Sequence, residues 1–96
     1  MPRPRVLTVP LESPYDDVDL DEIAVERFCM GDPPATYLLA ERREAVRLLS
    51  LRGLTDEAIA MRVEVTTRQV VKDRHALRAG SPTDGRWHHA RGRTAA

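Results

Sequence analysis

Four stretches of this chain place apolar residues at the spacing of an α-helix, and helix-breaking residues separate them. The first begins at the cap-like pair Asp19 and Glu22 and ends near Gly31, where two prolines follow. The second runs from about Thr36 to Arg52, and a glycine ends it. Charged positions lie between the apolar ones of this second helix and are expected to face water or a ligand. They are Glu41, Arg42, Arg43, Glu44 and Arg47.

The third and fourth stretches are joined by a tight turn at Glu64 and Val65. Thr55 precedes the third helix as a cap, with two acids in the first turn, where the helix dipole favours negative charge. Thr66 and Gln69 match a capping box, in which two backbone amides at the start of the fourth helix are satisfied. Long β-type alternation is absent, so we expect an all-α fold, a small four-helix domain. Its inward anchors are Ala58, Ile59 and Val63 in the third helix and Val70 and Leu77 in the fourth.

Proline and charge divide the chain into three parts. Residues 1–18 contain four prolines and predict an extended or disordered N-terminal arm. Residues 19–79 form the helical domain, and residues 80–96 are expected to be a flexible basic tail. Residues 1–33 contain three arginines and eight acids, whereas residues 66–96 contain seven basic residues and two acids. This segregation favours a basic surface for a polyanion and an acidic segment with a separate role, or two solvated ends without a common purpose.

Composition excludes several classes of protein. A chain of 96 residues supports one domain with a small core, and its single cysteine, Cys29, excludes an internal disulfide framework. No segment has the ~18 apolar residues of a membrane span, so a cytoplasmic protein is expected. We find no catalytic constellation, no phosphate loop and no metal-ligand spacing, and His88-His89 lacks further ligands. The sequence therefore predicts neither an enzyme nor a cofactor or metal.

Five positions across the third helix, the turn and the start of the fourth helix resemble the helix-turn-helix family: Ile59-Ala60, Val65-Thr66 and Val70. The resemblance implies that the small Ala60 lets the two helices approach, that Val65 fills the turn, and that Val70 packs the second helix onto the first. The motif would span residues 54–78.

A wider stretch, residues 38–78, resembles small DNA-binding regulators of actinobacteria and their phages. It is more distantly similar to the DNA-binding helices of LuxR-type regulators, sigma factors and serine-recombinase tails. Two positions depart from the pattern. Glu64 stands where the turn usually has glycine, so either a left-handed backbone costs about 1 kcal/mol there or the turn differs. Arg74 stands where an apolar residue is common, which indicates a thinner core or a salt bridge.

The fourth helix is expected over residues 66–78, and the resemblance places base contacts at its start. Arg68 has the geometry to bind guanine O6 and N7 with two hydrogen bonds, and Val71 suits a thymine methyl group. Each of these residues has a structural alternative, such as a solvated side chain for Arg68 and packing against the first helix or a partner for Val71. The expected base contacts are Thr67, Arg68, Val71, Lys72 and His75.

Phosphate contacts are expected around this helix and in the tail. Thr55 and Thr66 begin helices, where backbone amides suit an anion. Arginines complete the expected phosphate set: Arg43, Arg47, Arg74 and Arg78. The tail interleaves basic residues with an aromatic one and is a possible DNA arm through Arg86, Trp87, Arg91 and Arg93.

The sequence predicts a sequence-specific double-stranded DNA-binding protein, a transcriptional regulator that acts as a homodimer or as cooperative copies on DNA. The first helix is the candidate surface for a dimer or for core packing, through Val25, Phe28, Cys29 and Met30. One alternative is a protein-interaction factor that binds a partner, for example host transcription machinery, through the acidic arm at residues 15–20. Another is an architectural factor in recombination.

Overall fold

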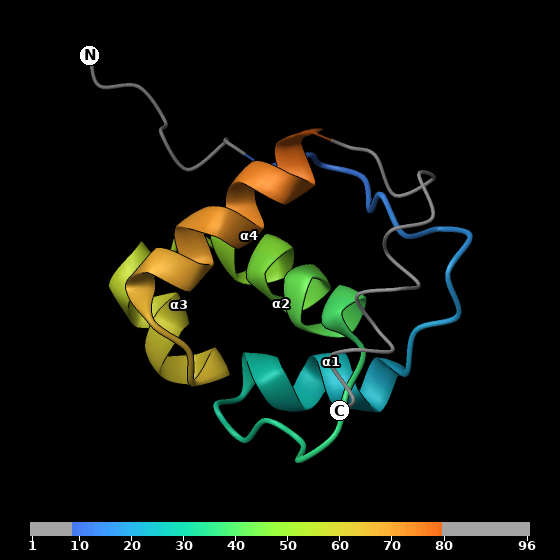
Figure 1. The fold of residues 1–96 in the computed structure, drawn as a ribbon, viewed down its shortest axis with the longest axis horizontal. Coiled ribbons are helices and arrows are strands. Elements are labelled where there is room, and N and C mark those ends of the chain that lie inside the picture. Colours follow the sequence, from blue (N-terminus) through green and yellow to red (C-terminus); the bar gives the residue numbers. More distant parts are fainter. Residues whose placement is uncertain (1–8, 80–96) are drawn as a thin grey trace.

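The computed structural model describes residues 9–79, and residues 1–8 and 80–96 lie outside the described part. Its four helices are α1 (Glu22–Cys29), α2 (Leu39–Leu51), α3 (Asp56–Val63) and α4 (Thr67–Ala79), and no strand occurs among the described residues (Figure 1). This confirms the all-helical, four-helix expectation. None of these helices has the length and apolar character needed to cross a membrane.

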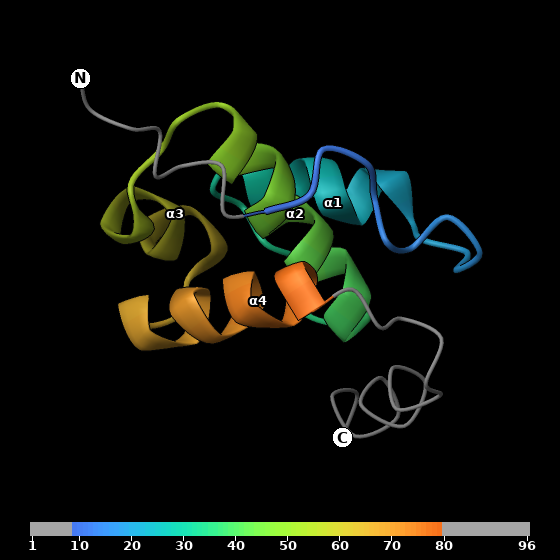
Figure 2. The ribbon, with the colours of Figure 1, turned by 90° about the horizontal axis from the view of Figure 1, so that it is seen from above.

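The central element is α2, which packs against each of the other three helices. Figures 1 and 2 both show it between α1 and α4, which do not pack against each other. A helix so placed has little surface left for solvent. The central position of α2 therefore determines how far its charged side chains are exposed.

Two helices begin later than the sequence predicts. Asp21, rather than Asp19, caps α1: its Oδ1 accepts from the amides of Ile23 (3.0 Å) and Ala24 (3.4 Å). The start of α2 lies at Leu39 rather than Thr36. The buried carboxylate of Glu41 fixes both starts, since it accepts from the amides of Leu38 (2.9 Å) and of Asp21 (2.8 Å). Two backbone donors compensate the burial of this charge.

The core is built from all four helices and from the segment that precedes them. Val9 and Tyr15 lie in this segment and are 5% and 2% exposed. Over its described part the predicted arm forms bends and turns rather than an extended chain, and a domain boundary at residue 18 is wrong because this part completes the core. The most buried helical side chains include Phe28, Val46, Leu49, Ile59, Val63, Val70 and Leu77.

The burial of Tyr15 predicts a loss of stability in alkali. Burial raises the pKa of the Tyr15 phenol above its usual value, and nearby Arg43 opposes this only in part. Above pH 10 the unfolded chain loses the phenolic proton while the folded chain keeps it, so the free energy of unfolding falls. The expected slope is up to about 1.4 kcal/mol per pH unit. Urea unfolding between pH 8 and 11 tests this: the slope must be smaller in Tyr15→Phe, and an equal slope contradicts the prediction.

The expectation that the charged residues of α2 face water is wrong. Glu41, Arg42, Glu44 and Arg47 are buried, and the side chain of Arg43 is 17% exposed. Each has a partner inside the protein, because the other helices and the N-terminal segment surround α2. Arg47 and Glu44, for example, form a two-bond pair of 2.6 and 3.0 Å.

Arg47 and Glu44 also hold the N-terminal segment. Nη1 of Arg47 donates to the Leu11 carbonyl oxygen at 2.7 Å, and the hydroxyl of Ser13 donates to Oε1 of Glu44 at 2.9 Å. The segment is therefore attached to α2 by charge-assisted hydrogen bonds as well as by its buried apolar residues.

The turn between α3 and α4 has a left-handed residue at Glu64, with φ 56° and ψ 49°. Of the two alternatives raised by the sequence, the strained backbone is therefore the one found. The Val65 amide donates to the Ala60 carbonyl at 3.1 Å, which closes the end of α3.

Glu64→Gly is expected to raise the free energy of unfolding by up to about 1 kcal/mol, because glycine adopts positive φ without the clash of a Cβ atom. Glu57→Gly is the matched control. It replaces an exposed glutamate inside α3 and is expected to lower stability, since glycine weakens a helix. Urea unfolding of both variants measures the difference. The same sign for both would contradict the role of the backbone at Glu64.

Candidate functional site

The outer face of α4 gathers the five side chains that the sequence assigned to base contacts. Thr67, Arg68, Val71, Lys72 and His75 are all exposed. They follow one another at steps of one and three residues, so they form one continuous strip along the helix. Val71, 37% exposed, is an outward apolar residue rather than a core residue. The strip extends to Arg78 near the end of the helix, which is also exposed.

The only acid of α4, Asp73, points away from this strip and is fully buried. Its two carboxylate oxygens accept from Nη2 and Nε of Arg42, each at 2.9 Å, and Oδ1 also accepts from Nε of Arg43 at 3.0 Å. Gln69 adds a fourth hydrogen bond through Nε2 at 3.2 Å. The negative charge of α4 is thus compensated inside the protein, and the exposed strip has only neutral and basic side chains.

The cluster of Arg42, Arg43 and Asp73 joins α2 to α4. Burial disfavours the charged form of Arg42, but its hydrogen bonds to Asp73 and the charge of Asp73 outweigh this and raise the pKa of the guanidinium. Tyr15 lies beside the same cluster, since the charges of Arg43 and Asp73 both act on its phenol. The cluster thus links the N-terminal segment with the helix that presents the strip.

Sequence reasoning missed the role of Asp73, although one signal was present. Asp73 lies three residues after Val70 and four before Leu77, which places it on the inward stripe of α4. An acid on an apolar stripe requires a buried partner.

Searches of known protein families, of curated proteins and of solved structures give no match to this chain. Its function is therefore inferred from the surface, the charges and the helix geometry.

The two threonines expected to contact phosphate serve as helix caps. Thr55 Oγ1 accepts from the Ala58 amide at 3.1 Å, and Thr66 Oγ1 accepts from the Gln69 amide at 3.1 Å. Only half of the predicted capping box is present at α4, because the side chain of Gln69 donates to Asp73 instead. Both threonines are exposed at helix starts and remain compatible with a phosphate contact.

The four arginines expected to contact phosphate differ in their surroundings. Arg78 is exposed, whereas Arg43 and Arg47 are held by Asp73 and Glu44 and would have to give up these pairs to bind a phosphate. Arg74 pairs with Asp56 through Nε and Oδ1 at 2.7 Å, so the salt bridge offered as one explanation of this unusual residue is present.

Two other expectations concerned the surface of α1 and the basic tail. In α1, Val25, Phe28 and Cys29 belong to the core of the chain itself, which leaves Met30 exposed. Core packing is thus the role of this surface. The possible DNA arm of Arg86, Trp87, Arg91 and Arg93 lies outside the described residues. Within the described range, no three His, Cys, Asp or Glu side chains group as a metal would require.

Proposed function

We propose that this chain is a sequence-specific double-stranded DNA-binding protein in which α3 and α4 act as a helix-turn-helix and α4 enters the major groove. The observation that carries the proposal is the outer strip of α4, which contains no acid because Asp73 is turned inward and paired. A helix with such a face fits the width of the major groove and the negative charge of the phosphates on either side.

The chemistry of the strip suits base contacts as well as phosphate contacts. Arg68 and Lys72 are exposed donors one turn apart, and Val71 between them is an exposed apolar residue beside these charges. Guanine O6 and N7 accept hydrogen bonds from such donors, while a thymine methyl group packs on a small aliphatic side chain. Arg78, nearer the end of the helix, is suited to a phosphate.

The bond network behind α4 supports the same role. Base recognition requires side chains held on a rigid element, and four hydrogen bonds to Asp73 tie α4 to α2 and to its own first turn. A transcriptional regulator is the form of DNA-binding protein that we propose.

Selection from random and genomic duplex DNA at two salt concentrations tests the proposal. We expect one enriched sequence motif and an affinity that falls steeply with salt, since each phosphate contact contributes about 0.9 to the log–log slope. A palindromic motif would support two copies on DNA. Salt-sensitive retention without an enriched motif would favour an architectural role, and no retention at low salt would exclude DNA binding.

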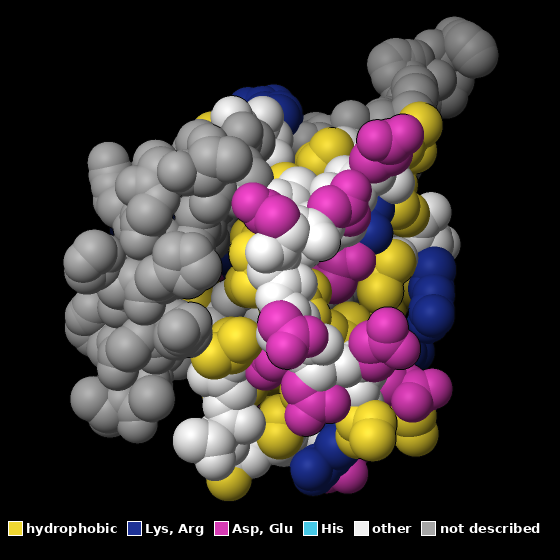
Figure 3. Space-filling model, turned by 90° about the vertical axis from the view of Figure 1, so that its right-hand side faces the viewer, with side chains coloured by type: hydrophobic (Ala, Val, Ile, Leu, Met, Phe, Trp, Pro, Cys, Tyr) yellow, Lys and Arg dark blue, Asp and Glu magenta, His cyan; other side chains and the backbone are white. Residues whose placement is uncertain are grey.

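The burial of Tyr15 weakens the alternative that this chain is a protein-interaction factor. This alternative used residues 15–20 as an exposed ligand, but Tyr15, the one aromatic side chain there, is 2% exposed and belongs to the core. The acids of that segment are exposed, however, and Figure 3 shows acidic side chains gathered on one side of the molecule. This acidic surface needs a separate explanation.

A further inference from the structure

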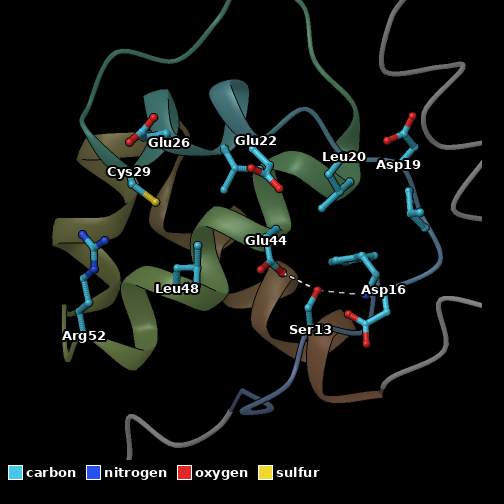
Figure 4. A pocket seen from close by; sticks show the side chains of 13 residues that line it. Ser13, Asp16, Asp19, Leu20, Glu22, Glu26, Cys29, Glu44, Leu48 and Arg52 are labelled. Carbon is cyan, nitrogen blue, oxygen red and sulfur yellow. Dashed lines mark hydrogen bonds between the residues drawn. The ribbon is translucent and has the colours of Figure 1, made fainter.

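A groove of about 570 Å³ lies between the N-terminal segment and helices α1 and α2 (Figure 4). Part of its lining is apolar and comes from all three of these elements. The apolar lining residues are Tyr15, Val18, Leu20, Val25, Cys29 and Leu48. Apolar surface in an open groove favours contact with an aromatic or aliphatic side chain over contact with water.

Five carboxylates line the groove as well, of which Glu44 is buried and paired with Arg47. The other four are Asp16, Asp19, Glu22 and Glu26. All four are exposed, and none forms a side-chain hydrogen bond or ion pair with another residue between Val9 and Ala79. The one basic lining residue, Arg52, lies at one end of the group in Figure 4. The groove therefore combines an apolar floor with a strongly negative rim and fits a basic segment that contains an aromatic residue.

The chain has one such segment. Residues 86–93, Arg-Trp-His-His-Ala-Arg-Gly-Arg, contain three arginines around the only tryptophan. The whole chain is neutral, but acids outnumber bases between residues 9 and 79, so the balancing positive charge lies in the terminal segments. Opposite charges on two parts of one chain attract at a high effective concentration.

The end of α4 is placed so that this segment can reach the groove. In Figure 1 the end of α4 and the start of the N-terminal segment lie at the same edge of the molecule, and Tyr15, which lines the groove, lies near Asp73 of α4. The six residues between Ala79 and Arg86 span up to about 20 Å when extended. No partner chain is needed to supply the occupant.

We propose that this groove binds residues 86–93 of the same chain, with Trp87 on the apolar floor and the arginines beside the rim carboxylates. This binding does not depend on the proposed function. If both hold, DNA and the groove compete for one basic segment, and release of that segment accompanies DNA binding.

Trp87 is the single tryptophan of the chain, so its intrinsic fluorescence tests the proposal directly. We compare the full chain with a synthetic peptide of residues 80–96, without DNA, at about 0.01 M and about 1 M salt, where the Debye length is about 30 Å and 3 Å. At low salt the full chain is expected to show a blue-shifted emission and several-fold weaker acrylamide quenching than the peptide. At high salt the difference is expected to shrink.

Charge reversal identifies the groove as the site. Glu22→Lys/Glu26→Lys is expected to make Trp87 as accessible as in the peptide. Glu57→Lys/Glu64→Lys changes the net charge equally, at exposed acids that do not line the groove, and is expected to keep the protection. Asp16→Lys/Asp19→Lys repeats the test outside any helix, should the first variant lose its helical circular dichroism.

Two outcomes overturn the proposal. The first is equal quenching of Trp87 in the wild type and in a folded groove variant at low salt. The second is a blue shift that grows with protein concentration, because the groove would then bind the tail of a second copy. Neither outcome bears on DNA selection, so the two proposals fail separately.

Discussion

Asp73→Ala is expected to lower the free energy of unfolding by about 3–5 kcal/mol, because it leaves two guanidinium groups without their buried counter-charge. Arg42 and Arg43 both donate to this carboxylate, which is fully buried. A small domain has about 5–15 kcal/mol of stability in total, so the loss would remove between roughly a fifth and all of it. Urea unfolding followed by circular dichroism measures the loss.

Two matched variants separate this explanation from a general effect of losing an acid. Asp56→Ala removes the partner of Arg74 in a more exposed pair, and its expected cost is below about 1 kcal/mol. Arg42→Met combined with Asp73→Leu removes a donor and the acceptor together and is expected to recover part of the stability. A cost for Asp73→Ala no larger than that for Asp56→Ala would refute the role of the buried charge.

Arg68→Ala is expected to weaken binding to the selected DNA motif about 5- to 150-fold, the equivalent of about 1–3 kcal/mol for a two-bond contact with guanine. Specificity should relax at one base pair, because the variant no longer discriminates there. Titration of the wild type and the variant against the motif and against each single-base change measures both effects.

Arg78→Ala gives the contrasting result. If Arg78 binds a phosphate, its loss weakens binding equally for all sequences and lowers the log–log salt slope by about 1. Arg27→Ala is the control, since this arginine of α1 pairs with Asp32, does not line the acidic groove and lies on a helix that does not pack against α4. An unchanged motif affinity in Arg68→Ala would remove the proposed base contact.

Local pattern was enough to predict the helices and most of the core. Val70 and Leu77 are buried as their spacing indicated, and Ile59 and Val63 likewise face inward in α3. Helical periodicity records which side of a helix is apolar, and this information lies within a few residues. The exposure of the α4 strip follows from the same periodicity.

Contacts between distant residues were beyond such reasoning. Arg42 and Arg47 resemble solvated arginines in sequence, and only the packing around α2 shows that each has a partner. The partner of Arg42 lies 31 residues away, in α4. Likewise, four prolines predicted an extended or disordered arm and gave no sign that residues 9–18 form bends and turns in which Tyr15 completes the core. Helix starts moved by two or three residues, because Asp21 and Glu41 satisfy amides that the pattern alone assigned elsewhere.

Because Val9 and Tyr15 are buried in the core, the smallest part of this chain that is able to fold alone must include both residues. A fragment cut at the first helix would retain all four helices, yet it would uncover the apolar surface beneath both side chains. It would also take the Leu11 carbonyl from Arg47 and the Ser13 hydroxyl from Glu44. For any transfer of the proposed DNA-binding unit into another protein, the piece to be moved therefore begins at or before Val9.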